Sequence, residues 1–514
     1  MSAGSLVESQ SAWPWGLRPG GRARGPAASS GRCGRLDLTA REIARRTGGE
    51  IIAGDPARRF LRGALDSRHV ARGALFVALP GARSDGHDFV ARACAAGAAG
   101  ALVMRPDVAV PAGAVLIQVP DTTLALQALG ASWRDELVGS VVGIAGSNGK
   151  TTTKEAVAAV LAQLGATAAT RGNANSQVSA PLTLLDVPRE ARFAVLELGT
   201  SAPGELTRLA AMARPDLCVI TAAFAEHLEG LGSLEGVIAA ECEILSGLRP
   251  GGRALIGSAE PRLVAAARAL RSAEVRTLGT SPDDDWQLAE IGLERGATVF
   301  ELRDPAGRTQ QWRVPLLGAP AAWAAAFAVA VARELTVPEA SSEASVEAAI
   351  ERGLAGLTAP AHRLAPRPAQ DRPWFVLDDS YNSNPASLAA AVETAVAIRR
   401  ADERLVLVVG DMLELGPAER ELHREVGRTI ARRVPSETVL IAVGPLAAEI
   451  AAHVSRADVV CRDVADAREA LAALRELVPA TGKTIVLAKG SRSIALDRVA
   501  DALAGPGTVS TRDD

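Results

Sequence analysis

A glycine-rich turn between an apolar strand and a helix constrains the fold of this chain more than any other feature. The segment VVGIAGSNGKTTTKE, residues 141–155, runs from the strand through the turn into a helix that should begin near Lys150. Backbone N–H groups of such a turn and the positive end of the helix dipole bind polyphosphate. A lysine after the last glycine adds nothing to the turn itself, but its ammonium reaches the outer phosphates of a nucleotide. The segment therefore predicts a nucleotide-binding loop, with a turn that holds no ligand as the alternative.

The glycine spacing of this turn is a variant of the P-loop. The strict pattern requires a glycine six residues before the lysine, where this chain has Ile144. A threonine hydroxyl next to the lysine is expected to bind Mg²⁺. The predicted nucleotide-binding residues of the loop are Gly146, Ser147, Asn148, Gly149, Lys150, Thr151 and Thr152.

Composition argues against several classes of partner and site. Basic and acidic residues are nearly balanced, 56 against 59, so no electrostatic argument favours nucleic acid or a membrane surface. The five cysteines form no CxxC pair, which argues against a disulfide framework or a zinc site and suits a reducing compartment. The longest apolar run, residues 320–332, covers roughly two-thirds of a membrane span and predicts a buried helix. We expect no nucleic-acid partner and no stable membrane insertion.

The 514 residues suffice for roughly three domains. Residues 1–35 are expected to form a disordered extension, because they are rich in Gly, Arg, Ser and Pro and lack a continuous apolar stretch. Three blocks follow: an N-terminal block (36–136), a central block (137–358) and a C-terminal block (359–514). In the last two, apolar strands alternate with helical segments, which predicts an α/β fold with parallel sheets. A ligand site is expected to face both blocks at the carboxyl ends of their strands.

Polar residues that can carry chemistry follow the predicted strands of the central block. Glu197 ends the strand FAVLEL, where its carboxylate is placed to hold Mg²⁺; a solvated acid at a strand end is the alternative. His227 lies one loop beyond the strand LCVIT, and Glu241 lies on the helix that follows. A structural histidine is as compatible with this position as a ligand.

The C-terminal block adds a second set of candidates. Arg363 stands near its start, and Asp379 ends the strand WFVLDD. Asn382 and Asn384 follow within SYNSNP, where they serve either a ligand or a turn. The segment that begins at Lys489, KGSR, is either an anion-binding turn or a plain solvated one.

Together these motifs resemble the ATP-dependent Mur ligases of bacterial peptidoglycan synthesis. The segments that carry the resemblance are DSRHVARGALFVALPGARSDGHDF, GSNGKTTTKE, GNANSQVSAPLTLL, ELGTSAPGE, DDSYNSNP, GDMLELG and AKGSR. The resemblance covers about residues 36–500. It implies three α/β domains: a small N-terminal domain that binds a UDP-sugar, a central P-loop-type ATPase domain with a parallel sheet, and a C-terminal Rossmann-like domain.

The resemblance also implies a reaction and roles for the candidates. ATP would phosphorylate the terminal carboxylate of a UDP-MurNAc-tripeptide, and the amine of D-Ala-D-Ala would attack the acyl phosphate. Lys150 would stabilise charge on the γ-phosphate, Thr151 and Glu197 would hold Mg²⁺, and His227 would lie near a second Mg²⁺. Arg363 and Asp379 would reach the nucleotide only after domain closure. The implied substrate residues are Ser67, Arg68, Gly86, His87, Asp88, Asn173, Asn175, Thr200 and Ser201.

This chain departs from the family pattern at several positions. Glu241 stands where the family carries a lysine whose carbamylated form helps to hold the second magnesium. We predict that Glu241 replaces that carbamate as a metal ligand; an acid on the helix surface is the alternative. The family's HNxxN segment, which helps to hold adenine, reads PAAWA at residues 320–324. We expect Trp323 to belong to the core rather than to stack on adenine.

Two other functions compete with the leading one. A related ligase would add a different amino acid or dipeptide to the same carrier. A non-catalytic paralogue would bind the nucleotide sugar without turnover. The resemblance further implies a cytoplasmic protein that is a monomer.

Overall fold

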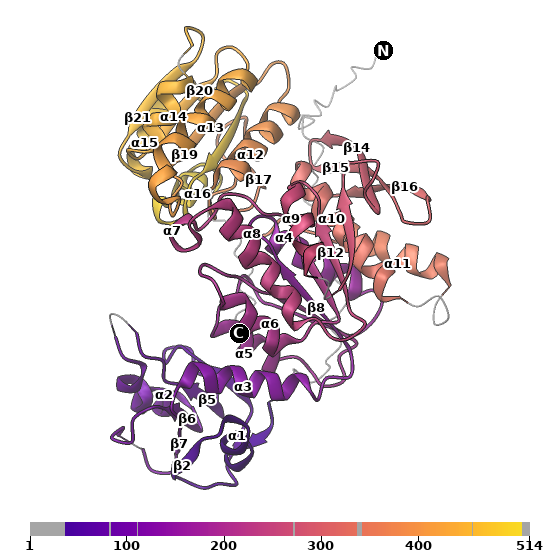
Figure 1. Cartoon of the computed structure of the whole chain (residues 1–514). Coiled ribbons are helices and arrows are strands. Elements are labelled where there is room, and N and C mark those ends of the chain that lie inside the picture. Colours follow the sequence, from indigo (N-terminus) through magenta and orange to yellow (C-terminus); the bar gives the residue numbers. More distant parts are fainter. Residues whose placement is uncertain are drawn as a thin grey trace, which may run out of the picture.

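The structure is a computed structural model, and it describes residues 36–81, 84–109, 111–270, 273–336, 342–454 and 456–505. The extension expected at residues 1–35 lies outside the described residues. The fold is mixed α/β with one large sheet in each of the three blocks, which confirms the predicted fold class (Figure 1). Among the described residues, no helix is both long enough and apolar enough to cross a membrane.

The N-terminal block contains a five-stranded sheet in the order β2-β7-β6-β5-β4 and a small β1-β3 pair. All neighbouring strands of the five-stranded sheet are parallel except β2 and β7. Helix α1 begins at a capping box that Thr39 forms with Glu42. The elements are β1 Leu38–Thr39, α1 Ala40–Thr47, β2 Glu50–Ala53, β3 Arg59–Phe60, β4 Arg62–Ala64, β5 Ala74–Val77, α2 Val90–Ala96, β6 Gly100–Val103, β7 Val115–Gln118 and α3 Thr122–Arg134.

The central block contains a nine-stranded sheet in the order β16-β15-β14-β13-β12-β11-β8-β10-β9. It is parallel from β9 to β14 and antiparallel from β14 to β16, an extension that the strand–helix rhythm did not predict. Its strands are β8 Ser140–Ala145, β9 Thr167–Ala169, β10 Phe193–Glu197, β11 Leu217–Ile220, β12 Arg253–Gly257, β13 Glu274–Gly279, β14 Trp286–Glu294, β15 Ala297–Arg303 and β16 Thr309–Val314. Its helices are α4 Lys150–Leu161, α5 Ser179–Leu185, α6 Glu205–Ala213, α7 Leu228–Leu231, α8 Leu234–Cys242, α9 Pro261–Ala269, α10 Ala319–Leu335 and α11 Glu343–Ala355.

The C-terminal block contains a six-stranded sheet in the order β17-β18-β22-β19-β20-β21, parallel except for the edge strand β17. Its strands are β17 Ala365–Pro368, β18 Trp374–Asp378, β19 Arg404–Gly410, β20 Val439–Val443, β21 Val460–Val464 and β22 Thr484–Lys489. Its helices are α12 Pro385–Ile398, α13 Glu419–Arg433, α14 Ala447–Val454, α15 Ala467–Leu477 and α16 Asp497–Ala504.

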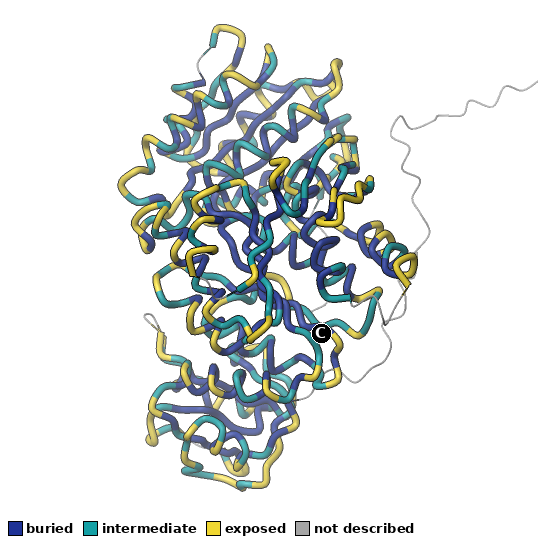
Figure 2. The backbone as a smooth tube through the Cα atoms, turned by 45° about the vertical axis from the view of Figure 1, so that its right-hand side comes forward, coloured by how far each residue is buried: buried dark blue, intermediate teal, exposed yellow. Residues whose placement is uncertain are grey.

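Hydrophobic cores form on both faces of the two larger sheets (Figure 2). One face of the central sheet shares its core with the N-terminal block, so these two blocks pack together. The other face is covered by α4, α10 and α11. Helix α10 contains the apolar run at residues 320–332 and is almost entirely buried, which confirms the buried helix expected there.

A buried ion pair joins the central and C-terminal blocks. Arg295, in the turn between β14 and β15, donates to both carboxylate oxygens of Glu403 at 2.8 and 2.7 Å. The Glu403 side chain is 0% exposed, and the Arg295 guanidinium also lies 4.2 Å from the ring centroid of Phe375. One nitrogen of the guanidinium, Nη1, makes both hydrogen bonds, so this contact links the β14–β15 turn to the C-terminal block.

We expect Arg295→Ala to lower the free energy of unfolding by about 3 kcal/mol, because it leaves the Glu403 carboxylate buried without its partner. Urea denaturation followed by circular dichroism measures the change. Arg313→Ala is the matched control, since its partner Glu294 is exposed and a surface pair contributes less than about 1 kcal/mol. Equal effects of the two substitutions would contradict the assignment.

Candidate active site

The phosphate loop joins β8 to α4, as the sequence predicts. Gly146 and Gly149 have φ values of +124° and +82°, in the region that favours glycine. A Cβ atom at Gly146 would lie 2.1 Å from the hydroxyl of Thr221, so no side chain fits there. The ammonium of Lys150 donates to the backbone carbonyls of Gly146 and Ser147 within the loop. The two glycines and the Lys150 ammonium therefore hold the conformation of the loop.

Glu197 ends β10 beside this loop and is 1% exposed. Its Oε1 accepts from the hydroxyl of Thr151 at 3.2 Å and from the amide of Asn175 at 2.8 Å. Its Oε2 is buried and has no hydrogen-bond partner among the residues that the structure describes. A carboxylate oxygen without a partner next to a threonine hydroxyl is a set of ligands that suits Mg²⁺, which binds oxygen and keeps several waters.

Glu241 lies behind the phosphate loop rather than in the cavity. Its Oε2 accepts from the backbone N–H of Gly146 at 2.6 Å, and it is not among the residues that line the cavity. Only 5% of the residue is exposed, which excludes an acid on the helix surface. Burial raises the pKa of Glu241 to about 7. In this structure Glu241 supports the phosphate loop. That it also serves as a metal ligand stays a prediction.

His227 is held between two carboxylates. Its Nδ1 contacts Oε2 of Glu414 at 2.5 Å, and its Nε2 lies 3.2 Å from Oε1 of Glu226. These contacts, the hydrogen bond with Glu226 first among them, raise the pKa of His227 although burial opposes the shift. Both ring nitrogens are therefore engaged by protein groups. Among the described ranges, no group of three or more His, Cys, Asp and Glu side chains is arranged to hold a metal ion. A second Mg²⁺ near His227 and Glu241 stays a prediction.

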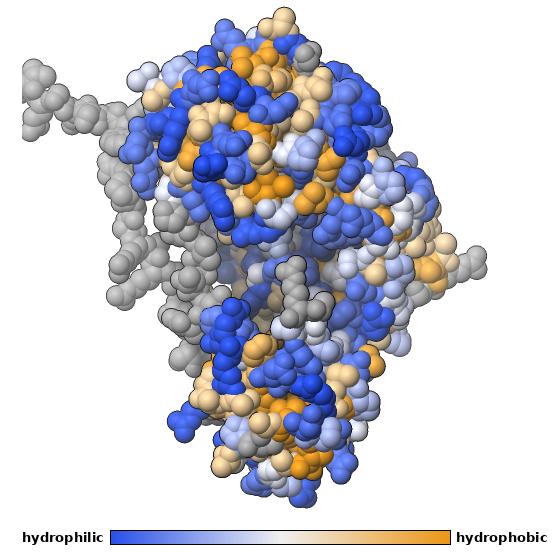
Figure 3. All heavy atoms as spheres, turned by 90° about the vertical axis from the view of Figure 1, so that its left-hand side faces the viewer, coloured by the Kyte–Doolittle hydropathy of each residue, from blue (hydrophilic) through white to orange (hydrophobic). Residues whose placement is uncertain are grey.

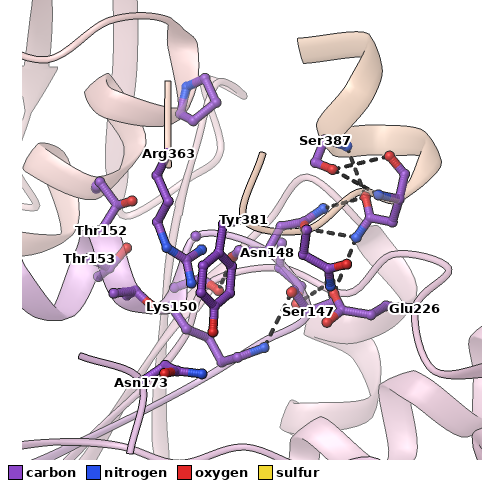
Figure 4. Close-up of a pocket in the computed structure, with 18 of the residues that line it drawn as sticks. Ser147, Asn148, Lys150, Thr152, Thr153, Asn173, Glu226, Arg363, Tyr381 and Ser387 are labelled. Atoms are coloured by element: carbon purple, nitrogen blue, oxygen red, sulfur yellow. Dashed lines mark hydrogen bonds between the residues drawn. The ribbon is translucent and has the colours of Figure 1, made fainter. Parts of the chain in front are cut away.

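The C-terminal block presents its candidates to the same cavity. Asp379 pairs with Lys489 at 2.7 Å and accepts from the backbone N–H of Leu364 at 3.0 Å. Burial raises the pKa of Asp379 although Lys489 opposes the shift. The guanidinium of Arg363 stacks on the Tyr381 ring at 4.0 Å (Figure 4). Arg363 and Asp379 line the same cavity as the phosphate loop. That they reach the nucleotide only after domain closure stays a prediction.

A cavity of about 830 Å³ lies between the phosphate loop and the C-terminal block. The side of the molecule drawn in Figure 3 is hollowed at mid-height, between the C-terminal and the N-terminal blocks. The predicted residues that line the cavity are Ser147, Asn148, Gly149, Lys150, Thr151, Thr152, Asn173, Asn175, Glu197, Thr200, Ser201, His227, Arg363, Asp379, Asn382 and Asn384. Gly146 does not line the cavity; its backbone N–H donates to Glu241 behind the loop. One cavity thus gathers candidates from both blocks.

The candidates of the N-terminal block do not line this cavity; they are Ser67, Arg68, Gly86, His87 and Asp88. His87 is 4% exposed, and both of its ring nitrogens are engaged, by Asp85 at 2.5 Å and by the backbone N–H of Met104 at 2.7 Å. The His87 ring therefore stabilises its own loop. Ser67 accepts from Arg92 at 3.0 Å, and Arg68 pairs with Asp66 at 2.7 Å.

Three side chains at the cavity were not among the site residues predicted from the sequence. Glu226 lines the cavity next to His227, and its place directly before a candidate histidine was the available signal. Ser383 carries a buried hydroxyl without a hydrogen-bond partner among the described residues. Trp323 packs, partly buried, against the core of the central block and also lines the cavity, with its ring centroid 6.4 Å from that of Phe327.

Comparisons with known proteins match this chain in three segments, one in each block. Three Mur ligase domains match the chain: the Mur ligase family, catalytic domain at residues 64–134, the Mur ligase middle domain at 144–332, and the Mur ligase, glutamate ligase domain at 362–492. The chain belongs to the Mur ligase family. The resemblance inferred from the motifs is thereby confirmed.

Two curated relatives and two solved structures show which members of the family this chain is similar to. UDP-N-acetylmuramoyl-tripeptide–D-alanyl-D-alanine ligase from Escherichia coli is 36% identical over 86% of this chain and 93% of its own length. The ligase of that name from Bacillus subtilis is 36% identical over 72% of this chain and 77% of its own length. MurF from Acinetobacter baumannii superposes with a TM-score of 0.80 at 30% identity, covering 92% of this chain and 99% of that one. MurF from Thermotoga maritima, solved in complex with ADP, gives 0.72 at 26% identity, covering 86% and 96%.

We expect Glu241→Gln to stabilise this Mur ligase at pH 8 more than at pH 5. The pKa of Glu241 is raised from 4.5 to about 7. Between pH 4.5 and about pH 7, the folded protein therefore keeps a proton on Glu241 that the unfolded chain has lost. Stability therefore falls as the pH rises through this window, and the loss is complete above the folded pKa. Glutamine removes that loss and keeps an acceptor for Gly146, a gain of ~1–3 kcal/mol. Urea denaturation at both pH values measures the difference.

Glu235→Gln is the matched control for this comparison, because Glu235 is an exposed acid on the same helix. Its effect on stability should not change between pH 5 and pH 8 by more than a few tenths of a kcal/mol. An effect of Glu241→Gln that does not depend on pH would contradict the burial of an ionisable carboxyl.

We also expect Trp323→Ala to raise KM for the nucleotide about fivefold, because an aromatic stacking contact is worth about 1 kcal/mol. Trp323→Phe keeps a ring at the cavity wall and should remain within about twofold of the parent protein. Steady-state kinetics with varied ATP measures both values. An unchanged KM in the alanine variant would remove Trp323 from the nucleotide site.

Proposed function

We propose that this chain is an ATP-dependent, ADP-forming ligase that joins D-Ala-D-Ala to UDP-MurNAc-tripeptide and so completes the peptidoglycan precursor. The observation that carries the proposal is that Lys150, Glu197, Arg363 and Asp379 line one cavity. Oε2 of Glu197 has no hydrogen-bond partner there among the residues that the structure describes. Support comes from the named activity of relatives that are 36% identical and from a similar structure that holds ADP.

The residues of the cavity suit an acyl-phosphate mechanism. The terminal carboxylate of the tripeptide attacks the γ-phosphorus and ADP leaves. The amine of the dipeptide then attacks the acyl carbon, loses a proton and expels phosphate. For the first step, Lys150 would exchange the carbonyls of Gly146 and Ser147 for phosphate oxygens and balance their charge. Burial alone would lower the pKa of Lys150, but Glu226, Glu241 and Glu197 outweigh it and raise that pKa, so its ammonium stays charged.

Thr151 and Glu197 are the residues that we propose for Mg²⁺, which would neutralise charge on the phosphates when bound. Arg363 adds a second positive charge from the C-terminal block, and its stacking on Tyr381 fixes its direction. The apposed blocks exclude water from the reactive acyl phosphate, which would otherwise hydrolyse. Asn173, Asn175, Thr200 and Ser201 are proposed to position the tripeptide at the cavity, since all four line it.

We further propose that the three blocks, 36–136, 137–358 and 359–514, act as domains, which is supported by one large sheet in each. Ser67, Arg68, Gly86 and Asp88 are proposed to serve the nucleotide-sugar end of the substrate, with His87 holding their loop. A cytoplasmic location and a monomeric state stay predictions from the sequence.

We expect Lys150→Ala to lower the rate of phosphate release by at least about 10³-fold, because it removes a positive charge aimed at the transferring phosphoryl group. The assay contains ATP, Mg²⁺, UDP-MurNAc-tripeptide and D-Ala-D-Ala, with released phosphate measured continuously. Lys483→Ala is the matched control, since Lys483 is an exposed lysine of the C-terminal block. Product formation by Lys150→Ala at the parental rate would overturn the mechanism.

The same assay separates the alternatives. Release with another amine but not with D-Ala-D-Ala would identify a related ligase. No release with any amine, together with binding of the nucleotide sugar, would identify a non-catalytic paralogue.

A further inference from the structure

A chain of hydrogen bonds crosses from the phosphate loop to the C-terminal block. Asn148 in the loop and Asn384 exchange two side-chain hydrogen bonds, of 2.8 and 3.2 Å. Asn384 caps α12, and its Oδ1 also accepts from the backbone N–H of Ser387 at 2.9 Å. Its remaining amide hydrogen goes to Oε2 of Glu226 at 3.2 Å (Figure 4). The donors of the Asn384 amide are thereby both used, and its orientation is set.

Glu226 also reaches the C-terminal block by a second route. Its Oε1 contacts Nε2 of His227 at 3.2 Å, and the other ring nitrogen of His227 contacts Glu414, in the loop after β19. The backbone N–H of Glu229 donates to the carbonyl of Glu414 at 3.4 Å. The loop between β11 and α8 is therefore attached to the C-terminal block at two points, and Glu226 takes part in both.

The surroundings of Glu226 keep it ionised. Burial alone would raise the pKa of Glu226, but Lys150, His227 and Asn384 outweigh it and hold that pKa below its usual value. Its side chain is 13% exposed. His227 adopts a φ of +52°, a backbone conformation that costs energy for a residue other than glycine and persists only when its surroundings impose it.

We propose that Glu226 is a positioning residue that couples the phosphate loop to the C-terminal block through Asn384 and His227. Oε1 of Glu226 contacts His227 and Oε2 accepts from Asn384. Removal of the carboxylate therefore weakens both attachments to the C-terminal block. The kinetic part of the test rests on the proposed ligase function; the part that measures the attachment of the block does not.

The first experiment measures amide hydrogen exchange in the full chain without substrates. In Glu226→Ala, the segments 222–231 and 381–390 should exchange at least about tenfold faster, because the protecting contacts across the interface open more often. Glu226→Gln keeps an acceptor for Asn384 and an amide that can donate to neutral His227, so it should stay within about twofold of the parent. Glu229→Ala is the matched control, since Glu229 is an exposed acid of the same loop.

The second experiment compares kinetic constants. Glu226→Ala should lower kcat by about 10- to 100-fold and change KM for ATP by less than about threefold, because the nucleotide contacts remain while the C-terminal groups lose their position. Glu226→Gln should restore most of kcat. The double variant Glu226→Ala with Asn384→Ala should lose no more than the larger of the two single losses, since the two residues act as one unit.

Three results would overturn the proposal. Unchanged exchange in Glu226→Ala would show that the attachment does not depend on this carboxylate. Multiplicative losses in the double variant would show that Glu226 and Asn384 act separately. Equal losses of kcat in the alanine and glutamine variants, with weaker Mn²⁺ binding by electron paramagnetic resonance in both, would make Glu226 a metal ligand instead. Absence of phosphate release from the parent protein would refute the ligase function and leave the exchange result to decide the role of Glu226.

Discussion

The arrangement of the cavity depends on a half-buried positive charge that carboxylates of the protein balance. Lys150 lies among three carboxylates, Glu197, Glu226 and Glu241, which come from β10, the loop after β11 and α8. A buried ammonium without such partners would lose its proton. Each carboxylate also serves a second purpose. Glu197 keeps an oxygen without a hydrogen-bond partner among the described residues, Glu241 holds the N–H of Gly146, and Glu226 holds Asn384. The carboxylates that balance the charge of Lys150 therefore also hold the walls of the cavity together.

The main elements of the fold could be predicted because their signals are local. The phosphate loop requires glycine at 146 and 149, and apolar runs of parallel strands are visible in the sequence without knowledge of their neighbours. The antiparallel strands β14 to β16 could not be predicted in the same way, because their alternating pattern is compatible with any half-buried sheet and does not say which edge it joins.

The candidate site was predictable in its residue types and less so in its contacts. Glu197 ends β10, Asp379 directly follows β18, and Lys150 follows β8 after the phosphate loop, so the carboxyl ends of the strands place all three at one cavity. Glu241 lies at the end of a helix, and whether its carboxylate turns to the cavity or to Gly146 depends on packing that no local pattern records. His227 and Glu414 meet across 187 positions of sequence. Such pairings follow from the assembled structure alone.

The buried pair of Arg295 and Glu403 has a consequence for how substrates enter. It joins the central and C-terminal blocks outside the cavity, and breaking it would leave the buried Glu403 carboxylate without its guanidinium partner. The contacts at the cavity include neutral hydrogen bonds, such as Asn148 with Asn384, and charged ones, such as His227 with Glu414. Because the pair lies apart from the contacts at the cavity, a substrate that displaces those contacts leaves this link between the two blocks in place.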